Sequence, residues 1–491
     1  MKLAGLLEHL EYETVKGSDQ IEVTELVNDS RKVTEGSVFV CISGAVVDGH
    51  EFIQEVAAKG AKAVIVERDA EAPEGMTVIK VKDTRYALAL MSAAYFHYPA
   101  KEMKIIGITG TKGKTTTTYM IRDILEHVGY KVGLIGTIEA IIGEKRIPAS
   151  NTTPESFTIH QYFREMADSG CDCVVMEVSS QALMLHRTAG IQFDLGIFTN
   201  LGRDHIGPNE HSDFEDYKRC KGILFTQCDV GIANADDEYY KDVFKNATCK
   251  VETFGFAKGC DLRAENTHLI SRPGYLGVAY HVSGLMDFDV EIDIPGTFSV
   301  YNSLTAIAVC RHFNVPEDVI CQALKSAKVK GRIEMIKVSD EFTLMIDYAH
   351  NAMSLESLLT TLKEYDPKRL VCLFGCGGNR SKDRRYEMGE VSGRLADLTV
   401  ITSDNPRFEE PQAIIDDIKT GIERTNGKYV EICDRKEAIR YVIEHGEPGD
   451  VIVLAGKGHE DYQEIKGVKY PMDERVLIAE VLEEMKECTQ K

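Results

Sequence analysis

A glycine-rich loop between a strand pattern and a helix pattern constrains this chain more than any other feature. Residues 107–118 read GITGTKGKTTTT. The strict phosphate-loop pattern G-x-x-x-x-G-K-[ST] would need glycine at Ile108, so it fails by one place. Gly110 and Gly113 still allow backbone N–H groups to surround phosphate oxygens at a helix N-terminus. The loop therefore predicts a nucleotide site on a parallel α/β sheet, and the alternative is an ordinary glycine-rich turn.

Polar residues follow the loop and the ends of two later strand patterns. In the loop, Lys114 can reach terminal phosphates and the Thr115 hydroxyl can hold Mg²⁺. The segment MEVSS puts Glu177 at the end of an apolar strand, and TNLGRDH puts Asp204 and His205 after the next strand. Because ligands bind at the carboxyl ends of parallel strands, these groups could hold metal ions beside the phosphates. The alternative for each residue alone is a satisfied polar group at a strand end.

Strand and helix patterns alternate almost throughout the chain, which predicts an α/β fold of βαβ units with parallel sheets. Residues 250–300 instead alternate at period two, as in hairpins. At 491 residues the chain is too long for one core. We predict three domains, with boundaries near residues 100 and 330: 1–100, 101–330 and 331–491.

Composition limits the classes of partner. The formal net charge is −21 and no basic tract offsets it, which argues against nucleic acid and anionic membranes. No run approaches the roughly 18 apolar residues that span a bilayer, and the acidic N-terminal segment is no secretory signal. The thirteen cysteines are scattered, which predicts reduced thiols in the cytoplasm rather than disulfides or a metal site. We therefore expect small-molecule substrates.

Ten motifs resemble those of the Mur ligases, the ATP-dependent amide-forming enzymes of peptidoglycan precursor synthesis. They occur in the family's order: GTKGKTT, NTTPES, MEVSS, TNLGRDH, GTFSVYNSLTA, VKGRIE, IDYAH, FGCGGNR, SDNPR and AGKGHEDYQ. The segment 28–52 also looks like the family's N-terminal nucleotide-sugar domain. The resemblance implies an N-terminal UDP-MurNAc-binding domain, a central P-loop ATPase domain with a parallel sheet, and a C-terminal Rossmann-like domain that binds the amino acid. It also leans toward a monomer.

The resemblance assigns candidate contacts to two substrates. For ATP it implies Gly110, Thr111, Lys112, Gly113, Lys114, Thr115, Thr116, Asn302, Arg332 and Asp347. For the UDP-MurNAc-dipeptide it implies Ser30, Thr152, Thr153, Ser179 and Arg187.

The resemblance also implies a catalytic set of Lys114, Glu177, His205 and Lys221. Lys221 matches a lysine that the family carbamylates into a metal ligand, so Thr115, Glu177, His205 and carbamylated Lys221 would hold Mg²⁺. Without the family match, the pattern around Lys221 favours a solvated helix lysine.

The stretch TSDNPRFEEP (402–411) is typical of a turn, because Asn-Pro favours turn initiation. In the family, however, Asp-Asn-Pro-Arg marks members that add meso-diaminopimelate. Asp404 and Asn405, with Pro406 shaping the turn, would address an ammonium group, and Arg407 would take the distal carboxylate. An arginine left unpaired by lysine would cost about 1–3 kcal/mol. The remaining diaminopimelate contacts implied by the resemblance are Arg380, Gly456 and Glu460.

Taken together, the resemblance implies an ATP-dependent ligase that joins meso-diaminopimelate to the D-Glu side-chain carboxylate of UDP-MurNAc-L-Ala-D-Glu through an acyl phosphate. The chain departs from common family residues at Gln181, Leu185, 206–211, Asn351 and Asn379. These departures leave open a paralogue that adds L-lysine or another amino acid, or that uses a modified acceptor. A nucleotide-dependent binding protein without catalysis is a third reading, which the presence of all four catalytic candidates disfavours.

Overall fold

The computed structural model describes residues 1–44, 47–203, 206–207, 210–272 and 274–489. The chain forms two compact units. Unit 1 comprises residues 1–261 with 305–315, and unit 2 comprises residues 262–304 with 316–491. The domain boundaries near residues 100 and 330 stay a prediction.

The first sheet of unit 1 has five strands in the order β1-β5-β4-β3-β2. Four of them run parallel, and β1 pairs antiparallel with β5. The strands are β1 (Tyr12–Lys16), β2 (Leu26–Val27), β3 (Val38–Val40), β4 (Ala63–Val66) and β5 (Thr77–Val81). The helices are α1 (Leu3–Leu6), η1 (Ser30–Lys32), η2 (Gly49–Phe52), α2 (Ile53–Ala58), α3 (Thr84–Tyr95) and η3 (Pro99–Glu102). Asp83 caps α3 because its carboxylate accepts from two free N–H groups of the first turn.

The second sheet of unit 1 carries the glycine-rich loop. Within this unit its strands follow the order β13-β12-β11-β6-β10-β7-β8-β9, and all run parallel except β8 and β9. The strands are β6 (Lys104–Thr109), β7 (Val132–Ile135), β8 (Glu139–Ile142), β9 (Lys145–Pro148), β10 (Cys173–Glu177), β11 (Phe193–Phe198), β12 (Cys228–Asn234) and β13 (Lys250–Gly255). The helices are α4 (Lys114–His127), α5 (Ser156–Asp168), α6 (Ser180–Met184), α7 (Phe214–Gly222), η4 (Ile223–Thr226) and α8 (Tyr240–Val243).

The strand order brings the candidate residues of unit 1 together. β6 lies between β10 and β11, and Glu177 is level with Ile108 while Phe198 is level with Thr109. Carboxyl ends of four neighbouring strands, β7, β10, β6 and β11, therefore meet at one edge of the sheet. The buried, apolar character of β6 and β10 is what a parallel strand covered on both faces requires.

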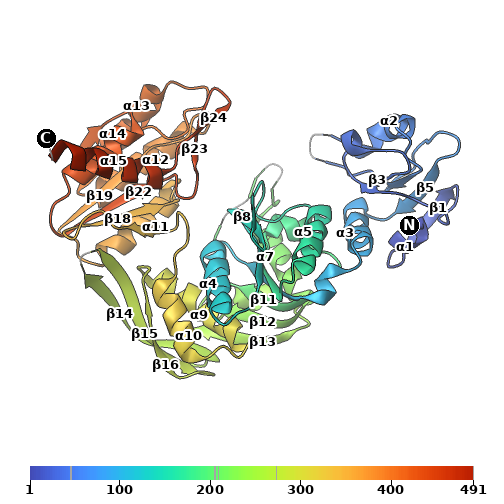
Figure 1. Cartoon of the computed structure of the whole chain (residues 1–491), viewed down its shortest axis with the longest axis horizontal. Coiled ribbons are helices and arrows are strands. Elements are labelled where there is room, and N and C mark those ends of the chain that lie inside the picture. The colour runs from blue at the N-terminus through green and yellow to red at the C-terminus, as the bar shows by residue number, and fades with distance from the viewer. Residues whose placement is uncertain (45–46, 204–205, 208–209, 273, 490–491) are drawn as a thin grey trace. The chain divides into compact units, whose positions relative to one another are not determined.

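Unit 2 contains a six-stranded sheet in the order β17-β18-β22-β19-β20-β21, in which only β17 is antiparallel. Figure 1 shows α11 to α15 around these strands. The strands are β17 (Glu334–Ile336), β18 (Thr343–Asp347), β19 (Arg369–Phe374), β20 (Leu398–Ile401), β21 (Tyr429–Glu431) and β22 (Asp450–Ala455). The helices are α11 (Ala352–Lys363), α12 (Lys382–Leu395), α13 (Pro411–Ile422), α14 (Arg435–Glu444) and α15 (Glu474–Thr489).

The rest of unit 2 is antiparallel or helical. The predicted hairpins appear as β14 (Leu262–Arg272), β15 (Tyr275–Gly284) and β16 (Phe288–Ile292), and a two-stranded hairpin follows the main sheet as β23 (Tyr462–Ile465) and β24 (Val468–Pro471). The remaining helices are α9 (Thr297–Arg311), whose last residues belong to unit 1, and α10 (Glu317–Ser326). The α/β class predicted from the sequence is confirmed.

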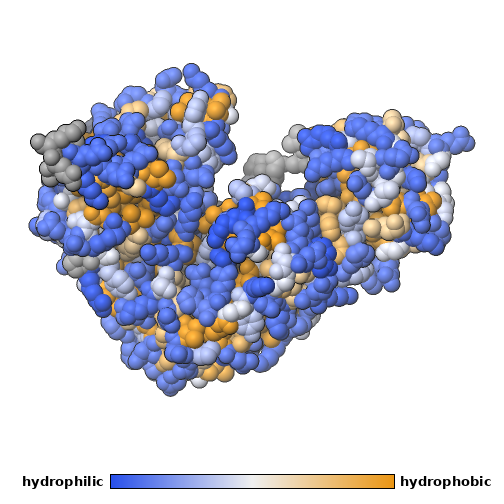
Figure 2. Space-filling model, viewed as in Figure 1, coloured by the Kyte–Doolittle hydropathy of each residue, from blue (hydrophilic) through white to orange (hydrophobic). Residues whose placement is uncertain are grey.

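Hydrophilic residues predominate on the face of the molecule drawn in Figure 2, with apolar residues in between. No helix in the described part of the chain is long and apolar enough to cross a membrane. The twelve cysteines from Cys41 to Cys433 are free; most are buried and Cys433 is exposed.

Candidate active site

The glycine-rich loop has the strand before it and the helix after it that a phosphate loop requires. β6 ends at Thr109, and α4 begins at Lys114 with Gly113 in the left-handed region at φ 86°. Gly110 has φ 149°, and a Cβ on it would lie 1.9 Å from Oγ1 of Thr199. Only glycine fits that approach, so the loop lies directly against the end of β11.

Two residues that the sequence analysis did not single out hold this loop. Oγ1 of Thr199 and Nδ2 of Asn200 donate to the carbonyl oxygen of Lys112 at 2.8 and 3.0 Å. Oδ1 of Asn200 accepts from the backbone N–H of Lys112 at 2.9 Å. Their position in TNLGRDH, directly after a strand that neighbours β6, was the available signal.

Two lysines point at one backbone oxygen of the loop. Nζ of Lys114 donates to the carbonyl of Gly110 at 2.8 Å and to that of Thr111 at 3.1 Å. Nζ of Lys221 donates to the same carbonyl of Gly110 at 2.9 Å, and it lies 4.5 Å from the ring centre of Tyr217. Lys221 is only 1% exposed. The reading of Lys221 as a solvated helix lysine is therefore wrong.

Glu177 forms an oxygen-rich cluster with hydroxyl groups from neighbouring strand ends. Its carboxylate accepts from Oγ1 of Thr115 at 3.1 Å and from both N and Oγ1 of Thr137 at 2.9 Å. Carboxylate and hydroxyl oxygens are the donor types that Mg²⁺ prefers, so Thr115 and Glu177 fit such an ion beside the loop. Thr137, at the end of β7, was missed by the sequence analysis. Asp204 and His205 lie outside the described residues.

A cavity of about 160 Å³ lies beside the loop and Glu177. Its lining comprises Gly110, Lys114, Asn151, Thr152, Thr153, Ser179, Ser180, Gln181, Arg187, Glu210, His211, Tyr217 and Lys221. The chain thus brings four of the five candidate acceptor contacts together with two candidate catalytic lysines. Ser30 is not among the lining residues; it begins η1 and its carbonyl accepts from Lys59 at 2.9 Å.

Hydrogen bonds fix the acceptor side of this cavity. Oγ1 of Thr153 donates to the carbonyl of Glu177 at 2.8 Å and accepts from the N–H of Ser179 at 3.0 Å. Nη1 of Arg187 donates to the carbonyl of Thr153 at 3.0 Å, and its Nη2 lies 2.6 Å from Glu155. The arginine is therefore oriented by the protein before any ligand arrives.

Some of the departures from common family residues lie in the same cavity. Gln181 lines it, and so does His211, which is 1% exposed. The imidazole of His211 lies 2.9 Å from Oγ of Ser180 and 3.0 Å from Oδ2 of Asp216. His211 thus connects Ser180, at the start of α6, with Asp216 in α7.

Donor atoms of His211, Asp216 and Cys220 lie within 4.8 Å of one another. Nη2 of Arg219 donates to Oδ1 of Asp216 at 2.6 Å and contacts the sulfur of Cys220 at 3.3 Å. Burial raises the pKa of Cys220 to about 11, which disfavours the thiolate. The guanidinium of Arg219 already pairs with Asp216, and burial disfavours the thiolate of Cys220, so this cluster gives no support for a metal site.

The three ATP candidates of unit 2 are placed as follows. The carboxylate of Asp347, at the end of β18, accepts from the N–H groups of Ile333 at 2.9 Å and Ala349 at 2.8 Å. The guanidinium of Arg332 lies 4.9 Å from the ring centre of Tyr348. Asn302 is half-buried in α9. Their roles toward ATP stay predictions.

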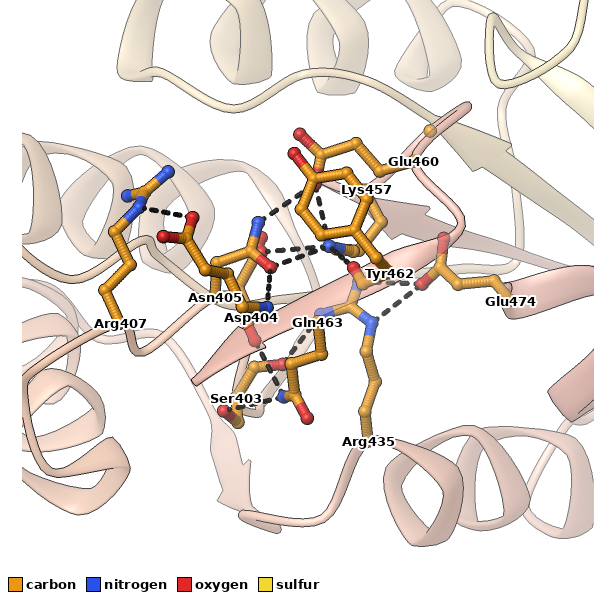
Figure 3. A network of polar contacts seen from close by, with 12 residues as sticks. Ser403, Asp404, Asn405, Arg407, Arg435, Lys457, Glu460, Tyr462, Gln463 and Glu474 are labelled. Atoms are coloured by element: carbon orange, nitrogen blue, oxygen red, sulfur yellow. Dashed lines mark hydrogen bonds and ion pairs between the residues drawn. The ribbon is translucent and has the colours of Figure 1, made fainter. Parts of the chain in front are cut away.

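The SDNPR segment follows β20 and centres on a lysine that the sequence analysis missed. Lys457 is fully buried, and its Nζ donates to Oε2 of Glu460 at 2.7 Å and to Oδ1 of Asn405 at 3.1 Å, with Asp404 at 3.6 Å (Figure 3). Nδ2 of Asn405 donates to the same glutamate at 2.9 Å. Lys457 lies between two residues of AGKGHE that were singled out, Gly456 and Glu460, and this position was the signal.

Burial and neighbouring charges shift the pKa values of two glutamates in this region. Burial alone would raise the pKa of Glu460, but the charge and hydrogen bond of Lys457 and the amide of Asn405 lower it below its usual value. Beneath it, Arg435 and Glu474 form a buried pair at 2.7 Å (Figure 3). Burial raises the pKa of Glu474 despite the adjacent guanidinium.

Arg407 differs from the sequence-based expectation. Its Nε donates to Oε2 of Glu464 at 3.0 Å, and its Nη1 donates to the carbonyl of Gly378 at 2.8 Å. The expectation that L-lysine would leave Arg407 unpaired is wrong, because Glu464 in β23 supplies a carboxylate. Arg380, by contrast, is exposed after β19, and Pro406 is buried.

Three family models match the chain. A model described as Mur ligase family, catalytic domain, matches residues 13–96. The Mur ligase middle domain matches residues 108–310, and the Mur ligase, glutamate ligase domain matches residues 331–458.

Similar proteins cover the full length. The UDP-N-acetylmuramoyl-L-alanyl-D-glutamate–2,6-diaminopimelate ligase of Clostridium perfringens is 43% identical over 490 residues, 98% of this chain and 100% of that protein. The ligase of the same name from Clostridioides difficile is 40% identical over 488 residues, 99% and 100% of the two chains. A solved structure of a ligase with this name has a TM-score of 0.74 at 27% identity and covers 99% of both chains.

Proposed function

The chain belongs to the Mur ligase family, and we propose that it joins meso-diaminopimelate to the D-Glu side-chain carboxylate of UDP-MurNAc-L-Ala-D-Glu with cleavage of ATP. The observation that carries this proposal is the network of Asp404, Asn405, Arg407 and Glu460 in unit 2. It offers carboxylates for an ammonium group and a guanidinium for a carboxylate, as the distal end of diaminopimelate requires. Relatives with 40–43% identity carry the corresponding name.

The reaction needs activation because a carboxylate is a poor electrophile. The γ-phosphoryl group of ATP passes to the D-Glu side-chain oxygen, which gives an acyl phosphate and ADP. The amine then attacks the carbonyl carbon, phosphate leaves, and an amide forms. Lys114, at the loop, stabilises the negative charge on the transferring group. The cavity beside it, with Thr152, Thr153 and the oriented Arg187, holds the acceptor.

Mg²⁺ would be held by Thr115 and Glu177, with His205 and carbamylated Lys221 as the further ligands that the family resemblance implies. When bound, it neutralises charge on the phosphates. Two features support carbamylation of Lys221. Its amine is buried, with the residue 1% exposed, and its Nζ donates to the carbonyl of Gly110 in the loop that carries the proposed Mg²⁺ ligand Thr115. The resulting anion would then be next to Lys114.

A Lys221→Ala variant tests the carbamate separately. We expect it to lose about 100-fold in kcat, the scale of one charge-stabilising group. Added acetate or formate should restore part of the activity, because a small carboxylate can occupy the space of the lost carbamate. Lys114→Ala should show no such recovery. Full activity of Lys221→Ala would contradict the role of a modified lysine.

We further propose that the enzyme works as a monomer in the cytoplasm, where ATP and nucleotide-linked precursors are available. The family resemblance supports this, and size-exclusion chromatography with light scattering and cell fractionation test it.

The test of the main proposal is phosphate release in reactions from which one component is omitted at a time. We expect release only when ATP, Mg²⁺, UDP-MurNAc-L-Ala-D-Glu and meso-diaminopimelate are all present. Replacing the acceptor by UDP-MurNAc-L-Ala controls for simple ATP hydrolysis. Release without the dipeptide acceptor would contradict the proposed reaction.

A second candidate is a Mur ligase that adds L-lysine. The pairing of Arg407 with Glu464 favours it, because this arginine would not be left without a carboxylate when lysine is bound. Turnover of L-lysine with a kcat/KM equal to that of meso-diaminopimelate would replace the first proposal by this one.

A further inference from the structure

The residue that faces Arg407 belongs to a hairpin that the proposed function leaves without a role. Glu464 lies in β23, and its backbone is fixed to the SDNPR segment on both sides. Its N–H donates to Oδ1 of Asn405 at 2.8 Å, and its carbonyl accepts from the N–H of Arg407 at 2.9 Å. The next residue, Ile465, forms a parallel bridge with Arg407. Glu464 is therefore positioned as firmly as the candidate amino-acid contacts themselves.

The guanidinium of Arg407 has five N–H bonds, and two of them donate to acceptors in the protein. Nε donates to Glu464 and one hydrogen of Nη1 donates to Gly378. Within the described part of the chain, Nη2 donates to no acceptor. Gly377 makes this placement possible, because a Cβ there would lie 2.9 Å from Nη1. An incoming carboxylate can therefore pair only with the Nη1–Nη2 edge.

Glu464 also changes the charge that such a carboxylate meets. Arg407 and Glu464 are each 23% exposed at the side chain, so the pair is partly shielded from solvent. A guanidinium that already has one carboxylate attracts a second one less strongly, and the two carboxylates repel each other. Conversely, a ligand without a distal carboxylate leaves Arg407 with a partner.

We propose that Glu464 is a specificity-determining residue of the amino-acid site. It acts as a built-in carboxylate that weakens the preference of Arg407 for an amino acid with a distal carboxylate over L-lysine. This inference rests on the proposed ligase function and concerns the strength of selection at that same site. It predicts that diaminopimelate binds through the Nη1–Nη2 edge while Glu464 keeps Nε.

The test is Glu464→Gln, which removes the charge but keeps an oxygen that can accept from Nε. We expect the KM for meso-diaminopimelate to fall about 2- to 5-fold, the scale of a partly exposed charge pair. The kcat and the KM for ATP should stay within about twofold of the wild-type values. The KM for L-lysine should not fall, so that the ratio of the two kcat/KM values rises.

Two comparisons separate the charge from other effects. Glu431→Gln removes an exposed glutamate paired with Lys419 at the surface of unit 2, and it should change none of these constants. Glu464→Gln combined with Arg407→Lys should lose most of the gain, because the gain depends on the guanidinium. Equal melting temperatures of the variants would exclude misfolding as a cause.

The outcomes are distinguishable from those of the proposed function. If wild-type protein makes no product with either amine, the ligase proposal fails and this inference fails with it. If the wild type makes product but Glu464→Gln leaves the meso-diaminopimelate KM unchanged or raises it, only the role of Glu464 is overturned.

Discussion

Charged side chains near the phosphate loop and near the SDNPR segment contact different kinds of partner. Near the loop, Lys114 and Lys221 both donate to the neutral carbonyl of Gly110. Near the SDNPR segment, Lys457, Arg407 and Arg435 pair with Glu460, Glu464 and Glu474. Lys114 and Lys221 thus contact a backbone oxygen of the loop, whereas each of the three cations near the SDNPR segment contacts a carboxylate.

The difference matches the net charges of the proposed ligands. ATP carries several negative charges, and Lys114, whose amine lies among the carbonyls of the loop, is placed to meet its phosphates. Diaminopimelate carries two ammonium and two carboxylate groups, and its net charge is near zero. A network whose charges already balance can bind such a molecule without a change in net charge. Each proposed site therefore suits the charge of the substrate proposed for it.

The largest expected effect concerns Lys457. Lys457→Met would leave Asp404 and Glu460 buried without their cation, and breaking such a pair costs about 3–5 kcal/mol. The urea midpoint of the full chain should fall accordingly. Lys436→Met is the matched control, since this lysine has two glutamate partners at the surface, where pairs contribute at most about 1 kcal/mol. Equal falls of the urea midpoint in both variants would contradict the view that the pairs of Lys457 contribute more than a surface pair.

The next effect concerns the loop. Lys114→Met should reduce phosphate release by about 100- to 1000-fold, because it removes a charge needed during phosphoryl transfer. Stability should change little. Lys145→Met, which removes an exposed lysine paired with Glu165, should retain wild-type rates. More than a tenth of wild-type activity in Lys114→Met would mean that the charge of Lys114 is not needed for phosphoryl transfer.

A smaller effect is expected at Arg407. Arg407→Lys keeps the charge but removes the planar fork that reaches Glu464 and Gly378. We expect kcat/KM for meso-diaminopimelate to fall roughly 5- to 150-fold, which corresponds to a loss of about 1–3 kcal/mol in transition-state stabilisation. Turnover of L-lysine should stay within about twofold. A uniform loss with both amines would assign Arg407 a structural role only.

The smallest effect is a pH dependence of stability at Glu460. The pKa of this carboxyl is lowered in the folded chain, so its ionised form stabilises the fold above its unfolded pKa, near 4.5. That contribution is lost as the pH falls through the lower, folded value. The stability difference between wild type and Glu460→Gln should therefore be constant at neutral pH and shrink below pH 4.5. A difference that grows in acid would contradict the lowered pKa.

Local patterns predicted the fold class and most of the loop site. Gly110, Gly113, Lys114 and Thr115 are close in sequence, and the βαβ alternation determines which strand ends meet. The pairing of Glu177 with Thr115 follows from that order. Thr137 and Asn200 were missed because their role depends on which strand lies next to β10 or β6, which no local pattern states.

The amino-acid site was less predictable. The roles of Asp404, Asn405 and Arg407 came from the resemblance, but their partners lie 52 to 57 positions later, in the loop after β22 and in β23. Glu464 becomes a contact because β23 runs beside the SDNPR segment, and Lys457 becomes one because it follows β22 of the same sheet. A burial pattern of alternating strand residues does not reveal which side chain would reach Arg407.

The central claim is that unit 2 selects a doubly zwitterionic amine for a carboxylate activated at the phosphate loop. A competition reaction tests it most directly: ATP, Mg²⁺, UDP-MurNAc-L-Ala-D-Glu and equal amounts of meso-diaminopimelate and L-lysine, with the product identified by mass spectrometry. The account predicts that the diaminopimelate adduct predominates in the wild type and increases further in Glu464→Gln. A predominant lysine adduct, or no adduct of either amine, would contradict it.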